Sequence, residues 1–366
     1  MNLKSIRRAA VPGIAALALL MSACGASNED GGSDNGDSGS SGLSGNLKGG
    51  GATSQEKAQE AWKTAFQGQN DGLTIDYALL GSTDGRSQFT SGALSFAGSD
   101  SYIADEELEA AKERCGGNVI EVPAYISSIA VAFNVPDVDT VNLDASTIAK
   151  IFDGKITNWN DKAIADQNPD ATLPDLKISP VHRADDSGTT KNFTDYLGKV
   201  ASSDWGYEAE DAFPVSGGLS AEGTSGVVKQ IGDVDGAIGY ADASQTGDLN
   251  VVSVKVGDEY VAPSPEGAAK TVAVSPVVEG RDATDIAVDV DRNTTEAGAY
   301  PVILLSYLIA CETYEDQAEA DNVKGYLSYI VSDEGQAEAA DFAGSAKLAP
   351  ETAAQAQEIV AGIAAQ

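Results

Sequence analysis

The sequence predicts an α/β protein built of layered helices and largely parallel β-sheets. From residue 45 onward, apolar strand-like runs alternate with segments of helical periodicity, which is typical of α/β layers. The 366 residues are enough for two domains with cores of their own. A hydrophobic content of 42% with 22% charged residues is ordinary for a globular protein.

The individual elements follow from runs of apolar residues and from their spacing. Strands are expected at residues 73–80, 93–97, 119–135, 177–182, 237–241 and 249–256. Helices are expected at residues 55–66, 105–114, 145–152, 190–197, 300–311, 321–331 and 352–364.

Residues 1–23 are typical of a targeting segment. Lys4, Arg7 and Arg8 form a positive region, and a short apolar run rich in Ala and Leu follows it. This run has the length of a signal-peptide core and is short for a membrane span. It ends in "LLMSAC", which resembles a bacterial lipobox and predicts lipidation of Cys24. The alternative is plain secretion with an incidental cysteine.

Residues 24–44 have almost no apolar side chains and predict a disordered tether rich in Gly, Ser and Asp. Such a flexible segment has a root-mean-square span of about 25 Å. A lipid at one end and a folded body at the other would make this segment a membrane tether.

The net charge of −33 restricts the partners. A nucleic-acid phosphate backbone requires a basic face, so nucleic acid is excluded as a partner, and so is charge-driven binding to anionic lipid. The remaining cysteines, Cys115 and Cys311, form an even pair outside the cytoplasm and predict a disulfide; two buried thiols are the alternative.

Three short segments rich in Gly, Ser and Thr join probable strands to helices or turns. They are "GGGATSQ" at residues 49–55, "LGSTDGR" at residues 80–86 and "HRADDSGTT" at residues 182–190. Glycine lets an anion approach the backbone, hydroxyl groups donate to it, and a helix N-terminus favours negative charge. Each segment alone is more simply an N-cap or a turn. Together with Arg183, they predict an oxyanion site.

The sequence lacks the common enzymatic motifs. "GGGATS" has neither the Lys-Ser/Thr ending of a P-loop nor the pattern of a dinucleotide fingerprint. One histidine cannot supply a histidine-based metal site, and the cysteines are too far apart for the short spacings of structural zinc. We therefore expect no cofactor, no metal and no catalytic residues.

An ordered set of motifs resembles the phosphate-binding subunit of bacterial high-affinity phosphate ABC transporters, the PstS family. The set comprises "GGGATS", "GSTDG", "FAGSD" and "RADDSGT", and then the similar segments "STIAKIFDGKITNWND" at 146–161, "GAIGY" at 236–240 and "YPVILLSYLIAC" at 300–311. The likeness extends from about residue 45 to residue 350.

The resemblance implies a two-lobed fold of the type II periplasmic-binding-protein kind, with the ligand between the lobes. Two strands would cross between the lobes, near residues 129–134 on the way out and 302–309 on the return. The first lobe would then hold residues 45–133 and 305–366, and the second lobe residues 134–304.

The resemblance also implies which residues bind phosphate: Thr53, Ser54, Ser82, Asp100, Arg183, Ser187, Gly188 and Thr189. Asp185 matches the acidic residue that orients the arginine. The chain departs from the family pattern at three positions, because Ser54 replaces a usual Phe, His182 a usual Arg and Asp186 a usual Gly.

The implied function is an extracytoplasmic lipoprotein, not an enzyme, that captures inorganic phosphate and delivers it to membrane permease subunits. The protein would be a monomer anchored through lipid to the outer face of the cell membrane. Asp100 would accept a hydrogen bond from a ligand O–H group, which phosphate has and sulfate lacks. The alternatives are an extracellular phosphatase-like hydrolase, a binder of sulfate or molybdate, and a structural or adhesive lipoprotein.

Overall fold

A computed structural model describes residues 42–366; the predicted signal segment, Cys24 and most of the predicted tether lie outside the described residues. In this part of the chain one sheet of eleven strands has the main order β2-β1-β3-β11-β4-β8-β6-β7, and β9 pairs with β4, β5 and β10. The bounds of these strands are β1 Gly45–Gly51, β2 Leu73–Leu79, β3 Phe96–Ser99, β4 Val119–Asn134, β5 Val141–Leu143, β6 Ser179–Arg183, β7 Leu219–Ala221, β8 Ala237–Asp242, β9 Asn250–Val256, β10 Glu259–Val261 and β11 Ile303–Cys311.

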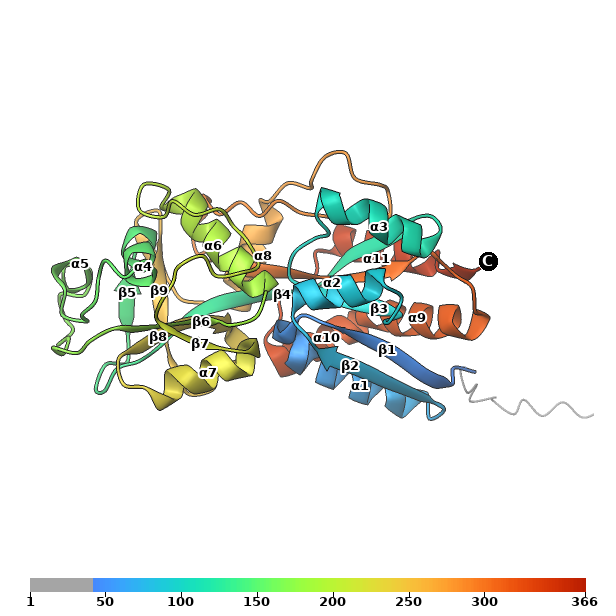
Figure 1. Ribbon diagram of the computed structural model, residues 1–366, viewed down its shortest axis with the longest axis horizontal. Coiled ribbons are helices and arrows are strands. Elements are labelled where there is room, and N and C mark those ends of the chain that lie inside the picture. The colour runs from blue at the N-terminus through green and yellow to red at the C-terminus, as the bar shows by residue number, and fades with distance from the viewer. Residues whose placement is uncertain (1–41) are drawn as a thin grey trace, which may run out of the picture. The chain divides into compact units, whose positions relative to one another are not determined.

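Two groups of elements lie on either side of β4 and β11 (Figure 1). The elements around β1, β2 and β3 are called the first lobe. Its helices are η1 Thr53–Gln55, α1 Glu56–Gln69, α2 Ser82–Thr90, α3 Asp105–Cys115, α9 Gln317–Ile330, α10 Asp333–Ala343 and α11 Pro350–Ala361. It also holds a small two-stranded sheet of β12 Thr313–Tyr314 and β13 Ala364–Ala365.

The elements around β6, β7 and β8 are called the second lobe. Its helices are α4 Ala145–Phe152, α5 Lys162–Ala165, α6 Gly188–Val200, α7 Gly223–Asp233 and η2 Ala243–Gln245. Helix α8, Pro265–Ala273, packs against β4, and the long connection 274–302 leads from it to β11.

Strand β4 belongs to both lobes. Its first ten residues, 119–128, pair antiparallel with β11, and residues Ile129 to Asn134 pair antiparallel with β8. Nearly every residue of β4 and all of β11 are buried, which explains why their sequences are mostly apolar. These two strands are the crossings that the two-lobed fold requires; the lobe bounds given above stay a prediction.

Most predicted strands are confirmed, but the prediction of largely parallel sheets holds only at the two ends. Strands β1, β2 and β3 pair parallel, as do β6, β7 and β8, whereas β4 and β11 are antiparallel to their neighbours. The helix predicted at residues 300–311 is wrong, because this segment forms β11. A short, mostly apolar run has no periodicity that separates a buried helix from a buried strand, and here pairing on both edges decides for the strand.

Cys115 and Cys311 form a disulfide between the last residue of α3 and the last residue of β11. Both ends of this link belong to elements that pack with the first lobe, so the disulfide does not cross between the lobes. Within residues 42–366, no helix combines the length and the apolar character needed to cross a bilayer.

Candidate functional site

In the first lobe, the predicted site residues follow the ends of three parallel strands. Thr53 and Ser54 begin the short helix after β1, Ser82 is the first residue of α2 after β2, and Asp100 directly follows β3. The carboxyl ends of neighbouring parallel strands meet at one sheet edge, where α/β proteins commonly bind ligands. All four side chains are buried, and Ser82 Oγ accepts from the backbone N–H of Asp100 at 3.1 Å.

The second lobe supplies the remaining residues from the junction of β6 and α6. Arg183 ends β6, Ser187 is the N-cap of α6, and Gly188 and Thr189 form its first turn. The Ser187 hydroxyl accepts from the Thr189 N–H at 3.1 Å, so the serine fixes the start of the helix. The N-terminal end of α6 therefore points its free backbone donors and the positive end of its dipole at the site.

Arg183 is buried, with 3% of its surface exposed, and its guanidinium is held on two sides. Its Nε donates to Asp185 Oδ1 at 2.8 Å, a second nitrogen donates to Asp185 Oδ2, and Nη1 donates to Ser187 Oγ at 2.7 Å. Although burial alone would raise it, the hydrogen bonds and charge of Arg183 hold the pKa of Asp185 below its usual value. Asp185 thus contacts the planar cation through both of its carboxylate oxygens.

Asp100 is a buried carboxylate among hydroxyl donors. Its Oδ1 accepts from Ser54 Oγ at 2.6 Å and from Ser306 Oγ at 2.7 Å, and its Oδ2 accepts from Thr189 Oγ1 at 2.9 Å. Burial raises the pKa of Asp100, and the three hydroxyl donors oppose that rise. Since Oδ2 accepts from only one of these hydroxyls, it can accept a further O–H donor.

Direct contacts join the two lobes around these residues. Thr189 of the second lobe donates to Asp100 of the first, and the Thr53 hydroxyl lies 2.9 Å from the Thr224 hydroxyl. Asn192 Nδ2 donates to the Asp100 carbonyl oxygen at 2.6 Å and to the Gly188 carbonyl oxygen at 2.9 Å. The structure therefore brings all eight predicted binding residues and Asp185 to one place between the lobes.

Three further residues of the site were missed from the sequence: Ser306, Asn192 and Thr224. Ser306 is the one polar residue in the apolar run of β11, and its hydroxyl also accepts from Gln55 Nε2 at 2.7 Å. Thr224 lies in "GTSG" at the start of α7, a segment of the same composition as the three that we singled out. Both signals were present in the sequence, whereas nothing in it distinguishes Asn192.

His182 and Asp186, which differ from the family pattern near Arg183, lie outside this cluster of side chains. His182 stacks on Phe213 with the ring centroids 4.4 Å apart, and its ring nitrogens contact the carbonyl oxygens of Arg183 and Gly217. Asp186 is exposed. Neither side chain contributes to the described contacts of Asp100.

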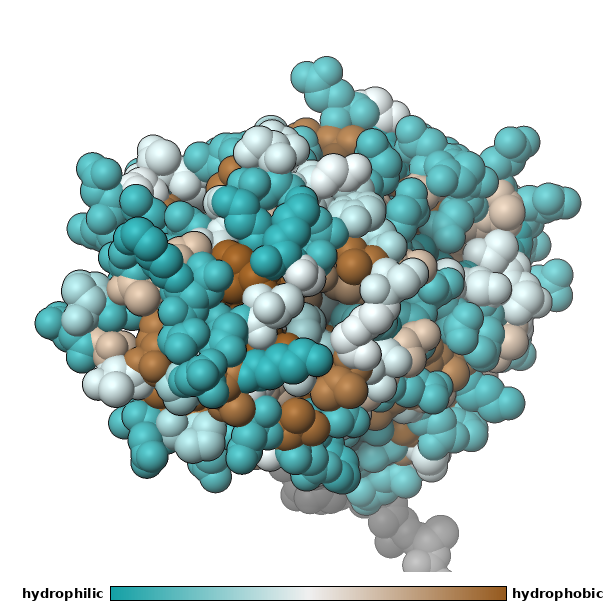
Figure 2. Space-filling model, turned by 60° about the vertical axis from the view of Figure 1, so that its left-hand side comes forward, coloured by the Kyte–Doolittle hydropathy of each residue, from teal (hydrophilic) through white to brown (hydrophobic). Residues whose placement is uncertain are grey.

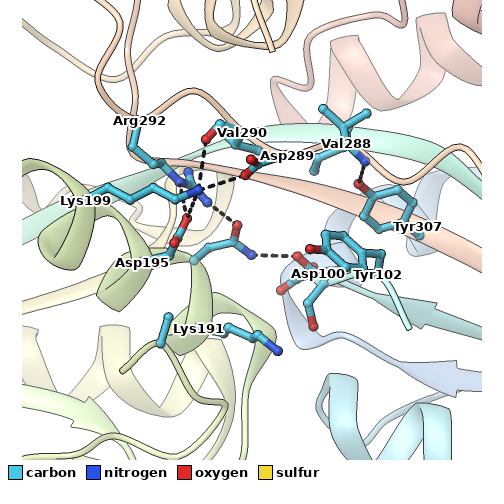
Figure 3. Close-up of a pocket in the computed structure, with 14 residues that line it drawn as sticks. Asp100, Tyr102, Lys191, Asp195, Lys199, Val288, Asp289, Val290, Arg292 and Tyr307 are labelled. Carbon is cyan, nitrogen blue, oxygen red and sulfur yellow. Dashed lines mark hydrogen bonds and ion pairs between the residues drawn. The ribbon is translucent and has the colours of Figure 1, made fainter. Parts of the chain in front are cut away.

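A pocket of about 120 Å³ adjoins the site, and Asp100 and Asn192 form part of its wall. Figure 3 shows Lys199 and Arg292 gathered around Asp195 on one side, with Asp100 and Tyr102 across from them. Arg292 also donates to the side-chain oxygen of Asn192, which orients the Asn192 amide toward Asp100.

The chemistry of this set is that of an anion cradle with one acceptor. Hydroxyl groups, helix N–H groups and Arg183 favour a compact oxyanion, and Asp100 favours one that carries a proton. In the part of the chain that the structure describes, no group of His, Cys, Asp or Glu residues is arranged to hold a metal ion.

Comparison with known proteins places this chain in a family. The model of the PBP superfamily domain matches residues 36–334. The phosphate-binding protein PstS 3 of Mycobacterium tuberculosis (strain H37Rv) is 34% identical over 337 residues, which cover 88% of this chain and 90% of that protein. The phosphate-binding protein PstS of Xylella fastidiosa is 31% identical over 255 residues, 68% of this chain and 67% of that protein.

Solved structures share the fold at lower identity. A high-affinity periplasmic phosphate-binding protein (PfluDING), bound with phosphate, superposes with a TM-score of 0.73 at 20% identity over 86% of this chain and 93% of that chain. A phosphate-binding protein from Stenotrophomonas maltophilia gives 0.68 at 20% identity over 86% and 94%. From the family model and the curated relatives, the chain belongs to the PstS family of phosphate-binding proteins, within the PBP superfamily.

Proposed function

We propose that this protein binds inorganic phosphate between its two lobes through Thr53, Ser54, Ser82, Asp100, Arg183, Ser187, Gly188 and Thr189. The observation that carries the proposal is Asp100, a buried carboxylate set among the donors of an anion site. The names of the relatives, which are phosphate-binding proteins, support the same ligand.

Asp100 selects for phosphate because a carboxylate repels an anion unless the anion brings a proton. Phosphate carries one or two protons at neutral pH, so a ligand O–H group donates to Asp100. Sulfate carries none and would face the carboxylate as a second acceptor, with no hydrogen between them. A site built around a ligand hydroxyl rejects an analogue that lacks it by roughly 10⁴-fold.

The test is a titration of phosphate and sulfate into the chain from residue 40 onward, which forms one compact unit. Calorimetry should give a phosphate complex at mildly acidic and mildly basic pH and no measurable sulfate complex. Asp100→Asn should narrow the difference between the two anions, because an amide can donate to either. Sulfate binding within about tenfold of phosphate would remove the specific role of Asp100.

Selectivity in this proposal comes from local groups. Polar and charged residues cover much of the face shown in Figure 2, and the net charge is −33, so the global field repels phosphate. Arg183 and the start of α6 act at short range in a buried place, where their interaction with an anion is strong. The site binds and releases phosphate without turnover, so p-nitrophenyl phosphate should remain intact in its presence.

The same proposal makes the protein the extracytoplasmic, monomeric binding component of a phosphate ABC importer. The ligand stabilises the arrangement in which the lobes are together, and the permease subunits recognise that arrangement. Lipid on Cys24 holds the protein at the outer face of the membrane. A single acyl chain binds membranes only marginally, so the proposal implies more than one acyl chain on Cys24.

The anchor has its own test, because it is independent of the binding site. Cells that express Cys24→Ala should release the protein into the medium, whereas Cys115→Ala, which leaves the N-terminal segment intact, should not change the partitioning. A Cys24→Ala protein that stays with the membrane fraction would contradict the lipid anchor.

A further inference from the structure

Helix α2 carries a second contact surface one turn beyond its phosphate-site residue. The helix begins at Ser82, and the side chains of Thr83 and Arg86 lie along the same stretch. Arg86 is buried at 5% exposure. Its Nε donates to Glu107 Oε2 at 2.9 Å, and its Nη1 donates to Ser99 Oγ and Ser101 Oγ, each at 3.0 Å. The first lobe therefore fixes this guanidinium. Its remaining nitrogen, Nη2, lies 3.5 Å from Glu107 Oε1 and makes its shorter contact with the second lobe.

Asp211 of the second lobe occupies that position. It lies in the connection between α6 and β7, and its Oδ2 accepts from Arg86 Nη2 at 2.9 Å and from Thr83 Oγ1 at 2.7 Å. The Arg86 and Asp211 side chains are 6% and 14% exposed, so water screens this ion pair little. Asp211 of one lobe thus contacts an arginine that Glu107 and two serines of the other lobe hold in place.

The backbone of Asp211 reaches the phosphate site directly. Its carbonyl oxygen accepts from the Ser187 N–H at 2.9 Å, and Ser187 is both the N-cap of α6 and a partner of Arg183. One residue therefore joins the first lobe, through its carboxylate, to the start of the phosphate-binding helix, through its carbonyl. The other hydrogen bonds of Ser187 among the described residues, with Arg183, Thr189 and Lys191, stay within the second lobe.

Formation of the ion pair buries a carboxylate oxygen that has no partner, and this burial depends on how closely the lobes approach. Asp211 Oδ1 is buried without a hydrogen-bond partner among the described residues. A buried charge pair gains little stability overall, but removal of one partner leaves the other charge uncompensated. When the lobes separate, water can reach both groups. The loss of one partner therefore destabilises mainly the arrangement in which the lobes are together.

We propose that Asp211 is a positioning residue, which holds the lobes together through Arg86 and Thr83 and thereby sets how long phosphate stays bound. The proposal rests on the proposed phosphate-binding function. Asp211, Thr83 and Arg86 need not touch the ligand. They raise the population of the arrangement that binds it, and the apparent affinity rises with that population.

The experiment is a double-mutant cycle on the full chain, with Arg86→Met, Asp211→Asn and the double variant. Arg86→Met should raise the phosphate Kd by about 30-fold or more, since it leaves the buried Asp211 charge unpaired. Asp211→Asn keeps an oxygen acceptor for Thr83 and should raise the Kd by about tenfold. The double variant should bind better than the product of the two single effects predicts, because each removes the same interaction.

Kinetics and selectivity separate a positioning role from a direct one. Stopped-flow measurements should place most of the change in the dissociation rate, and the preference for phosphate over sulfate should not change. The matched control is Asp204→Asn in the same connection. Asp204 pairs at 3.4 Å with Lys150 of its own lobe, so this variant should keep the wild-type Kd. Thermal unfolding without phosphate checks that each variant folds.

The outcomes distinguish this inference from the function on which it rests. A wild-type chain that binds no phosphate contradicts the proposed function. A wild-type chain that binds phosphate while Asp211→Asn and Arg86→Met both stay within about twofold of it contradicts the role of Asp211. The role of Asp211 is also contradicted if the Kd change of the double variant equals the product of the two single Kd changes, because the two residues would then act independently. If Arg86→Met fails to fold, Asp211→Asn and Thr83→Val carry the same test.

Discussion

Gly188 and Ser82 approach each other across the two lobes so closely that a methyl group on Gly188 would lie 2.6 Å from the Ser82 hydroxyl oxygen. The same methyl group would lie 2.8 Å from Cβ of Asp100. The glycine is therefore required by the contact between the lobes and not by the conformation of the helix. The first turn of α6 reaches the first lobe only because this position has no side chain.

Gly188→Ala should weaken phosphate binding by about tenfold or more, because overpacked contacts typically cost 1–3 kcal/mol and here they oppose the approach of the lobes. Calorimetry measures the effect. The control is Gly198→Ala in the same helix, where the added methyl group would lie no closer than 3.9 Å to any neighbour. Equal Kd values for both variants would mean that α6 does not approach Ser82 when phosphate binds.

Arg183→Ala should nearly abolish phosphate binding, and Arg183→Lys should restore only part of it. The loss of one partner of a buried charge pair costs about 2–5 kcal/mol, and a lysine keeps the charge without the two-pronged geometry. Lys177→Ala removes an equal charge from an exposed position just before β6 and serves as the control in the same calorimetric titration. An unchanged affinity for Arg183→Ala would place the site elsewhere.

Asp242 should make the stability of the protein depend on pH. Burial raises the pKa of its carboxyl to about 7, although hydrogen bonds from Ser244 favour the carboxylate. The folded chain therefore holds a proton that the unfolded chain releases near pH 4. The stabilising effect is full below that pH and is lost as the pH rises through about 7.

Asp242→Asn should remove this dependence, since the amide mimics the protonated acid. Urea denaturation should show the variant gaining on the wild type between about pH 4 and pH 7, by up to roughly 4 kcal/mol at 1.36 kcal/mol for each pKa unit. The control is the same substitution at an exposed position, Asp316→Asn at the N-cap of α9, which should not remove the pH dependence. A wild-type to Asp242→Asn difference that is constant over this range would show that Asp242 is ionised throughout.

Removal of the Cys115–Cys311 disulfide should destabilise the fold and leave phosphate binding intact. The link closes a loop across 196 residues. The chain-entropy model gives so long a loop about 5 kcal/mol of stabilisation, and strain in the native state reduces that value. Denaturation of Cys115→Ala/Cys311→Ala measures that loss. The Kd should stay within about twofold, since no part of the link spans the two lobes; a larger change would couple the disulfide to closure.

The sequence predicted the elements with clear periodicity and misread the glycine-rich ones. Residues 49–55 resemble a turn in the sequence because Gly49, Gly50 and Gly51 favour one, yet these three glycines form the last part of strand β1 and allow close packing there. A side chain at Gly49 would overlap the Phe96 ring, and one at Gly51 would overlap the Gly98 carbonyl oxygen. Helix α2 was likewise read only as a turn from "GSTDG", because its first turn is made of residues that favour turns.

The site was predictable where motifs are contiguous and unpredictable where the fold brings distant residues together. Arg183, Ser187 and Thr189 lie in one segment, so their roles could be inferred jointly. Asp211 is one of 56 acidic residues, and no local pattern marks it. Its significance comes from Arg86, which lies 125 residues earlier and is turned toward it by Glu107 and two serines.

The position of β11 has a consequence for the order in which the chain can fold during synthesis. In the sheet, β11 lies between β3 and β4, although residues 303–311 follow both strands by more than 150 positions. Until that late segment has emerged, β3 and the first part of β4 have no partner on the edges that they will share with it. The second lobe, whose strands lie entirely upstream of β11, can form first. The strands at residues 96–99 and 119–128 therefore keep unpaired edges until residues 303–311 have been made, and unpaired edges are where a nascent chain is open to wrong pairing.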